Sequence, residues 1–377
     1  METIGFAGTA KNTGKTTALT AVAAEAARTG LRLALTSIGM DGEAKDNVTG
    51  LPKPRVHVPA GALVATAIPF EAGPSPAGVL ATLELLSVTP FRSPLGPVAI
   101  YRVLHAGLTV LAGPLVKSEL DLVLDSLRAG GADLALVDGA VNRLAPLAAV
   151  DQMVLSTGAA RHESAQVILD EAQALAFLFD LPAVADGGEG AGGDPAGGQP
   201  GGGIPAAPLP QVNWPGPAVL TDETAAADLA AFLTAAPPPV SRRSPFRLVF
   251  PSLVATKALR ALVTRLIESH VVPGELVFPS AATLVVAGPA PDTAAALLRL
   301  NAAGWQVLLS SAVRLAAITV SPYRPVYDRR GRFYTAGRMA DGEYSALVDA
   351  LGRRIRCPVI DVVRAGPTGL FKRLTQV

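Results

Sequence analysis

The sequence predicts an α/β protein, in which a parallel sheet with helices on both faces is joined to a second, smaller α/β domain. Three observations indicate this architecture. Apolar strand-like runs alternate with helix-like stretches along most of the chain, which is the pattern of parallel strands joined by helical crossovers. A stretch rich in Gly and Pro interrupts the alternation at 186–217. The chain has 377 residues, 50% of them hydrophobic, which is enough material for two cores.

The first half opens with a strand, a loop and a helix. The apolar run 4–7 predicts the strand, and the strong helix formers of 16–30 predict a helix that ends at Gly30. The remaining predicted elements of this half are strands at 31–39, 133–140 and 152–160, one or two strands within 98–113, and helices at 118–132 and 163–179.

The second half is expected to form a separate domain. The segment 186–217 carries few apolar residues, which predicts a flexible linker or a long surface insertion. We therefore predict a first domain over 1–185 and a C-terminal α/β domain over 218–377, with its core starting near 245. The expected elements of that core are strands at 247–255, 283–289, 305–311, 316–322 and 358–363, and helices at 256–270, 291–304 and 342–355.

Composition excludes several classes of function. The net charge is only +1, from 32 basic and 31 acidic residues, whereas a nucleic-acid-binding domain usually has a strong basic excess. The single cysteine, Cys357, cannot form an intramolecular disulfide or a CxxC metal site, and its apolar surroundings predict an inert thiol. The start of the chain does not resemble a signal peptide, and no apolar run of about 18 residues predicts a membrane span. We expect a cytoplasmic protein.

Residues 8–17, GTAKNTGKTT, predict a phosphate-binding loop. The core of the motif, Gly14-Lys15-Thr16, lies between a predicted strand and a predicted helix, which is the context that the motif requires. Backbone N–H groups and the helix dipole favour an anion there. Lys15 is expected to bridge the β- and γ-phosphates, and the Thr16 hydroxyl to bind Mg²⁺. The candidate nucleotide contacts are Gly8, Thr9, Lys11, Asn12, Thr13, Gly14, Lys15, Thr16 and Thr17.

The spacing of this loop differs from the usual one by one residue. Gly8 stands one position too early, and Thr9 occupies the position where the first glycine is expected. A chance match in a chain rich in Ala and Gly is the alternative interpretation. The strand before the loop and the helix after it favour a site for ATP with Mg²⁺.

Two aspartates follow predicted strands and are candidate metal or catalytic groups. Asp138 ends the apolar run LALVD and has the setting of a carboxylate that holds Mg²⁺. Asp41 follows the second strand, where it could orient the attacking water or contact the metal. A solvated turn before Gly139 or Gly42 is the alternative for each. Glu43 and Asp46 lie close to Asp41 and remain alternatives to it.

The segment 51–61, LPKPRVHVPAG, places Arg55 and His57 on one face of an extended chain, beyond Lys53. These side chains could contact phosphate, a partner or a small anion. An exposed edge strand with a solvated polar face is the equally simple alternative.

The loop GTAKNTGKTT resembles that of the dethiobiotin-synthetase and MinD/ParA branch of the P-loop NTPases, whose dimers often close over nucleotide. The form GTxxxxGKT matches the dethiobiotin-synthetase spacing. Lys11 is similar to the signature lysine of MinD/ParA but sits one position late, because Ala10 occupies the matching place. An ordinary solvated lysine is the alternative. The resemblance implies a P-loop NTPase sheet and leaves a homodimer open.

A second resemblance covers much of the first half. TSIGMDGEAKDNVTGLPKPRVHVPAGALVATA, with GTAKNTGKTT before it and LVDGAVNR after it, resembles the ATPase subunit of lysine 5,6-aminomutase reactivases; VRLAAITVSPYRP in the second half is similar as well. The resemblance implies an ATPase that reactivates an adenosylcobalamin-dependent lysine 5,6-aminomutase with a MutS-related partner. Hydrolysis would drive the release of damaged cofactor.

Two other functions remain open at this point. One is an ATP-dependent ligase of the dethiobiotin-synthetase type, although VDGAVNR replaces the VEGAGG-like stretch expected there. The other is a regulatory nucleotide-binding module. No DxHxxG pattern is present, so the chain is not expected to hold the corrinoid itself. No NKxD pattern is present either, so the sequence leaves the choice between ATP and GTP open.

Overall fold

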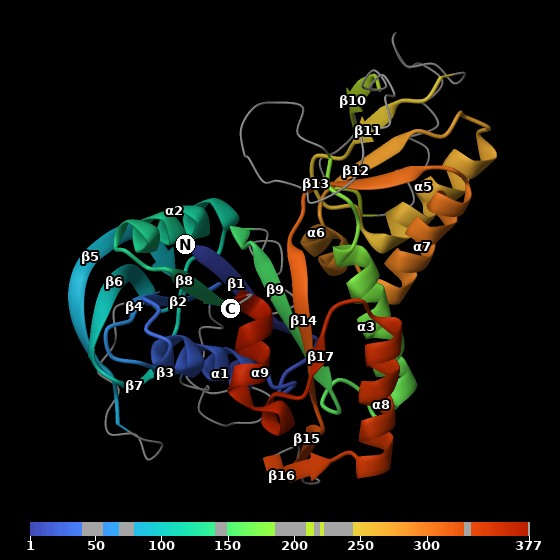
Figure 1. Cartoon of the computed structure of the whole chain (residues 1–377). Helices are drawn as coiled ribbons and strands as arrows, with labels where there is room; N and C mark the ends of the chain where they lie inside the picture. The colour runs from blue at the N-terminus through green and yellow to red at the C-terminus, as the bar shows by residue number, and fades with distance from the viewer. Residues whose placement is uncertain are drawn as a thin grey trace, which may run out of the picture. The chain divides into compact units, whose positions relative to one another are not determined.

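A computed structural model describes residues 1–39, 56–67, 79–139, 149–184, 209–214, 219–221, 244–327 and 333–375. The chain divides into two compact units (Figure 1). Unit 1 combines Met1–Asp180 with Val313–Val377, and unit 2 is Leu181–Ala312. Both units contain parallel strands and helices, so the predicted α/β class is confirmed. Within the described residues no helix has the length and apolar character needed to cross a membrane.

Unit 1 is built on a nine-stranded sheet in the order β17-β14-β9-β1-β8-β2-β4-β6-β5. The pairs from β17 to β4 are parallel, and β4, β6 and β5 pair antiparallel at one edge. The strands are β1 (Glu2–Gly8), β2 (Leu33–Ser37), β4 (Leu63–Ala67), β5 (Thr82–Ser93), β6 (Gly96–His105), β8 (Leu134–Asp138), β9 (Gln152–Gly158), β14 (Arg314–Ser321) and β17 (Val359–Ile360).

Two helices from opposite ends of the chain lie side by side on this sheet (Figure 1). They are α1 (Lys15–Arg28) and α9 (Val362–Thr375). Leu19 of α1 and Phe371 of α9 share one buried cluster with Ile4 and Phe6, alternate residues of β1. The other helices of unit 1 are α2 (Lys117–Ala129), α3 (Ala165–Phe179) and α8 (Asp341–Arg354), and two small antiparallel sheets pair β3 (Val56–Val58) with β7 (Gly107–Thr109) and β15 (Tyr323–Tyr327) with β16 (Phe333–Arg338).

Unit 2 has a four-stranded parallel sheet in the order β10-β11-β12-β13. Its core includes the stacked rings of Phe250 and Phe278, with Trp214 against Phe250. The elements are β10 (Gln211–Asn213), β11 (Arg247–Val249), β12 (Glu275–Ser280), β13 (Gln306–Ser311), α5 (Thr256–Glu268), α6 (Ala281–Val286) and α7 (Ala290–Ala302).

The domain boundaries differ from those predicted. Residues 313–377 were expected in the C-terminal domain but belong to unit 1, because β14 pairs with β9 along its whole length. Most of the predicted linker lies outside the described residues, while 211–213, at its end, form β10 of the unit 2 sheet. An apolar strand such as β14 fits either parallel sheet by composition, so its sequence does not indicate which sheet it joins.

One predicted strand of the second half is a helix. The run 283–289 is rich in Leu and Val, but residues 281–286 form α6. Ser280 and Thr283 form a reciprocal capping box at the start of this helix, and such a cap supplies hydrogen bonds that only a helix start can use.

A buried tyrosine ties the C-terminal segment to the sheet. The Tyr344 hydroxyl lies 3.0 Å from the carbonyl oxygen of Val320 and 2.7 Å from Asp361 Oδ2. Asp361 Oδ1 accepts hydrogen bonds from the backbone N–H groups of Val363 and Arg364, at the start of α9. Burial raises the pKa of Tyr344, and Asp361 raises it further, so the hydroxyl keeps its proton over the physiological pH range.

We expect Tyr344→Phe to destabilise unit 1 by about 1 to 3 kcal/mol, because it removes the hydroxyl between two buried acceptors. Urea unfolding followed by circular dichroism measures the change. Tyr323→Phe is the matched control, because Tyr323 is substantially exposed, and it should leave the unfolding midpoint unchanged. An equal effect of the two substitutions would contradict this role of Tyr344.

Candidate functional site

The predicted phosphate loop lies at the centre of the unit 1 sheet. β1 ends at Gly8 and α1 begins at Lys15, so residues 9–14 connect them at the carboxyl edge of the parallel strands. β1 lies between β8 and β9. The chain continues from β1 to β2 on one side, and from β9 to β14 on the other. Open α/β sheets bind ligands at such a point, where the connections diverge.

The loop has a backbone conformation suited to an anion. Asn12 and Gly14 have positive φ angles of 65° and 92°, and Gly14 is the N-cap of α1 without a side-chain cap. The backbone N–H groups of the first turn therefore have no side-chain acceptor at this cap. A helix start of this kind binds phosphate oxygens.

The unusual spacing of the motif has a structural reason. The hydroxyl of Thr13 folds back to donate a hydrogen bond to the carbonyl oxygen of Ala10 at 2.9 Å. A Cβ atom at position 8 would lie 2.5 Å from that hydroxyl oxygen. Any larger residue at position 8 would therefore displace the Thr13 hydroxyl, which favours glycine there, one position before the usual glycine.

Residues from β9 and β14 support the loop, and sequence reasoning missed them. The Thr9 N–H donates to the carbonyl oxygen of Ser156 at 2.9 Å. A Cβ atom on Gly14 would lie 3.5 Å from Ser321 Cβ, and one on Gly158 would collide with the Ser321 carbonyl oxygen at 2.0 Å. The sequence offers one indication of this role: both strands are apolar runs with Ser, Thr or Gly at their carboxyl ends.

The two central candidates, Lys15 and Asp138, meet in the structure. Lys15 Nζ lies 2.7 Å from Asp138 Oδ1 and donates a hydrogen bond to the carbonyl oxygen of Gly139, also at 2.7 Å. Their side chains are 24% and 20% exposed. Asp138 reaches the loop because β8 pairs in parallel with β1, with Phe6 opposite Asp138.

The other candidates differ in how far the structure describes them. Thr16 is half-buried in the first turn of α1, whereas Lys11, Asn12 and Thr17 are exposed. His57 is exposed on β3, which pairs with β7 and is not part of the main sheet. Five candidates lie outside the described residues, namely Asp41, Glu43, Asp46, Lys53 and Arg55.

The residues present fit a magnesium–triphosphate complex. Mg²⁺ usually takes one or two protein oxygens together with phosphate oxygens and water, and the Asp138 carboxylate and the Thr16 hydroxyl supply such groups. In the described part of the chain no three His, Cys, Asp or Glu residues cluster as a metal site. A metal at this loop would therefore depend on the phosphates for most of its ligands.

The single cysteine does not take part in this chemistry. Burial raises the pKa of the Cys357 thiol to about 11. The side chain is therefore a neutral thiol at physiological pH, whereas nucleophilic cysteines react as thiolates.

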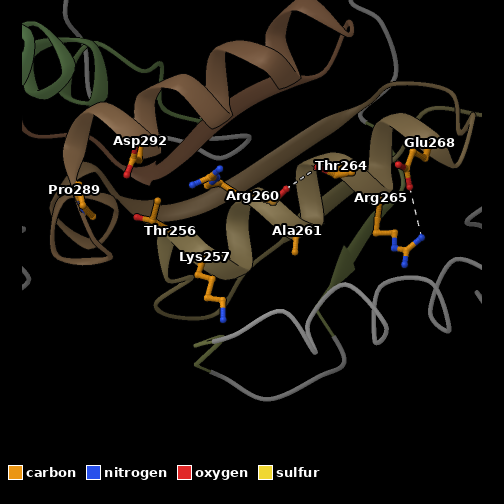
Figure 2. Close-up of a pocket in the computed structure, with 9 residues that line it drawn as sticks. All are labelled: Thr256, Lys257, Arg260, Ala261, Thr264, Arg265, Glu268, Pro289 and Asp292. Atoms are coloured by element: carbon orange, nitrogen blue, oxygen red, sulfur yellow. Dashed lines mark hydrogen bonds and ion pairs between the residues drawn. The ribbon is translucent and has the colours of Figure 1, made fainter.

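A separate groove of about 820 Å³ lies on unit 2, along one side of α5 (Figure 2). Arg265 pairs with Glu268 at 3.5 Å. The described residues that line the groove include hydroxyl, cationic and carboxylate side chains, and none of them is a His or a Cys. These residues are Thr256, Lys257, Arg260, Ala261, Thr264, Arg265, Glu268, Pro289 and Asp292.

Comparison of the chain with models of protein families, with curated proteins and with solved structures found no match. The geometry of the loop and the pairing of Lys15 with Asp138 are therefore the features that indicate a function.

We expect Gly158→Ala to disturb the support of the loop, because the added methyl group would meet the Ser321 backbone at 2.0 Å. Backbone atoms cannot move aside as a side chain can, so the loss of stability should be about 1 to 3 kcal/mol. Urea unfolding is the measurement. Gly61→Ala is the control, because Gly61 also has a positive φ but has no atom within 4 Å of the added position. Equal destabilisation by both variants would show that the chain moves to relieve the collision with Ser321, and would contradict this role of Gly158.

Proposed function

We propose that this chain is a P-loop NTPase that binds ATP with Mg²⁺ at residues 8–17 and hydrolyses it. The observation that carries the proposal is the meeting of Lys15 and Asp138 within 2.7 Å at an uncapped helix start. A cation for the phosphates, a carboxylate for the metal and free N–H groups are the parts that this chemistry uses.

Each residue has a distinct proposed role. The N–H groups around Gly14 hold phosphate oxygens, and Lys15 bridges the β- and γ-phosphates. Thr16 and Asp138 hold the metal, and Asp41 is proposed to orient water or contact the metal. Bound Mg²⁺ neutralises charge on the phosphates, which lowers the barrier to their cleavage.

The isolated protein should be a slow hydrolase. Arg161 and Arg324 follow β9 and β14 at the same edge of the sheet as the loop, and each pairs with a glutamate, Glu171 and Glu163 respectively. P-loop NTPases without an arginine that contacts the transferred phosphate are slow until a partner supplies one. A slow basal rate is what we expect of a switch that acts on a client protein.

We expect Lys15→Ala to abolish ATP binding, because the ammonium group that neutralises the β- and γ-phosphates is lost. Isothermal titration calorimetry with ATP and Mg²⁺ is the measurement. Lys117→Ala is the matched control, because Lys117 forms an exposed ion pair with Asp121 on α2. The Lys117→Ala variant should bind ATP with the same affinity as the unmodified protein. Unchanged affinity in Lys15→Ala would exclude this loop as the site.

The resemblance to reactivase ATPases supports a more specific proposal. Nucleotide binding and hydrolysis would alter how this chain engages an adenosylcobalamin-dependent lysine 5,6-aminomutase, together with a MutS-related partner, so that damaged cofactor is released. The near-neutral net charge of +1 gives no indication of nucleic acid as an alternative client.

A reconstitution tests the client. We expect inactivated lysine aminomutase, supplied with this protein, the MutS-related partner, ATP, Mg²⁺ and fresh adenosylcobalamin, to recover its activity. Lys15→Ala should give no recovery, and Lys117→Ala should give full recovery. Recovery with Lys15→Ala would show that nucleotide chemistry is irrelevant, and ATP consumption that depends on an added carboxylic acid would favour a ligase.

A further inference from the structure

The two edge strands of the unit 1 sheet differ in length. One is β17, which has two residues, and so short an edge offers little for another chain to pair with. The other is β5, which has twelve residues and spans about 40 Å (Figure 1). β6 pairs with one side of β5, and among the described residues no strand pairs with its other side. Within that part of the chain, the outer side of β5 can therefore accept a further strand.

The edge strand β5 carries apolar side chains in contact with solvent. Leu85, Leu86 and Val88 are 54%, 40% and 57% exposed. The charged residues of β5 are Glu84 and Arg92, one on each side of this run. Edge strands are usually protected by charged side chains along their length, and a long apolar edge without them marks a surface for association.

The two charges of β5 indicate a second copy of the same strand as the partner. Glu84 and Arg92 lie four residues before and four residues after Val88. If two copies pair antiparallel about Val88, the acidic end of each strand lies beside the basic end of the other, and the apolar side chains between them meet across the pair. A parallel pair would instead bring like charges together at both ends.

The irregularities of β5 also match those of a second copy. The register of β5 against β6 shifts at Leu86, and it shifts again between Val88 and Arg92. Such shifts bend and twist a strand. In an antiparallel pair about Val88, each shift of one copy faces the other shift of its partner, so the two bends coincide. A regular strand of another protein would not follow these bends.

We propose that β5 is the interface of a two-fold homodimer, in which the β5 strands of two copies pair antiparallel about Val88. The same patch serves both copies, so the contact closes at two chains and does not extend into a fibre. Four strands separate β5 from β1, the strand that leads into the phosphate loop. The inference is therefore independent of the proposed function, and the contact needs no nucleotide.

Sedimentation velocity of the full chain without nucleotide, over a range of concentrations, tests the interface. We expect the unmodified protein to sediment as a dimer. Val88→Lys sets two ammonium groups beside each other at the two-fold axis and should raise the dissociation constant of the dimer by at least ~100-fold. Leu298→Lys is the matched control, because Leu298 is 51% exposed on α7 of unit 2, and this variant should remain dimeric.

Thermal unfolding followed by circular dichroism shows whether Val88→Lys is folded. Leu85→Lys has the same expected result and serves if it is not. An unmodified protein that is monomeric at every concentration, a folded Val88→Lys that stays dimeric, or equal dissociation by Leu298→Lys would each overturn the inference. Lys15→Ala should remain dimeric. A dimer that forms only with ATP and Mg²⁺ and is lost in Lys15→Ala would place the contact at the loop, which overturns this interface and leaves the nucleotide site standing.

Discussion

The parallel pairing of β1 with β8 and β9 is the constraint on which the site depends. Parallel neighbours end at the same edge of a sheet, and the register sets Phe6 opposite Asp138 and Gly8 opposite Ser156. The end of β1 is thus flanked by a carboxylate on one side and by hydroxyl and carbonyl groups on the other. A register change of one residue would turn Asp138 to the opposite face of the sheet, and the loop would lose its carboxylate.

The same sheet is completed by residues from the end of the chain. β14 pairs with β9 and brings Ser321 against the loop, while α9 packs beside α1, the helix that starts at the loop. Unit 2 lies between these parts in the sequence. The proposed nucleotide site is therefore not supported until residues after 313 have folded back, across contacts of long sequence separation. Contacts of this kind form slowly, because they must first close a long loop.

The sequence predicted what local patterns encode. The loop, the helix after it and Asp138 at a strand end are all recognisable within about ten residues, and the structure brings Lys15 and Asp138 together. The sequence did not predict that β14 joins the sheet of unit 1, because an apolar strand can pair with either parallel sheet. The capping box of α6 could be recognised from the sequence, but the Leu and Val content of that run led to the prediction of a strand. Ser321 was missed for the same reason as β14, since its role depends on the strand that carries it.

The ion pair of Lys15 and Asp138 also answers a local problem of charge. Lys15 is the first residue of α1, and the first turn of that helix has no acidic residue. The positive end of the helix dipole disfavours a cation there, so Lys15 is electrostatically unfavourable at this position unless a negative charge lies close to it. Asp138, 123 residues further along the sequence, offsets this charge without capping the helix. A carboxylate on the helix itself would offset it equally well but would stand among the N–H groups that the proposed phosphate contacts use. By placing the negative charge on a neighbouring strand, the fold stabilises Lys15 without a side-chain cap on the helix.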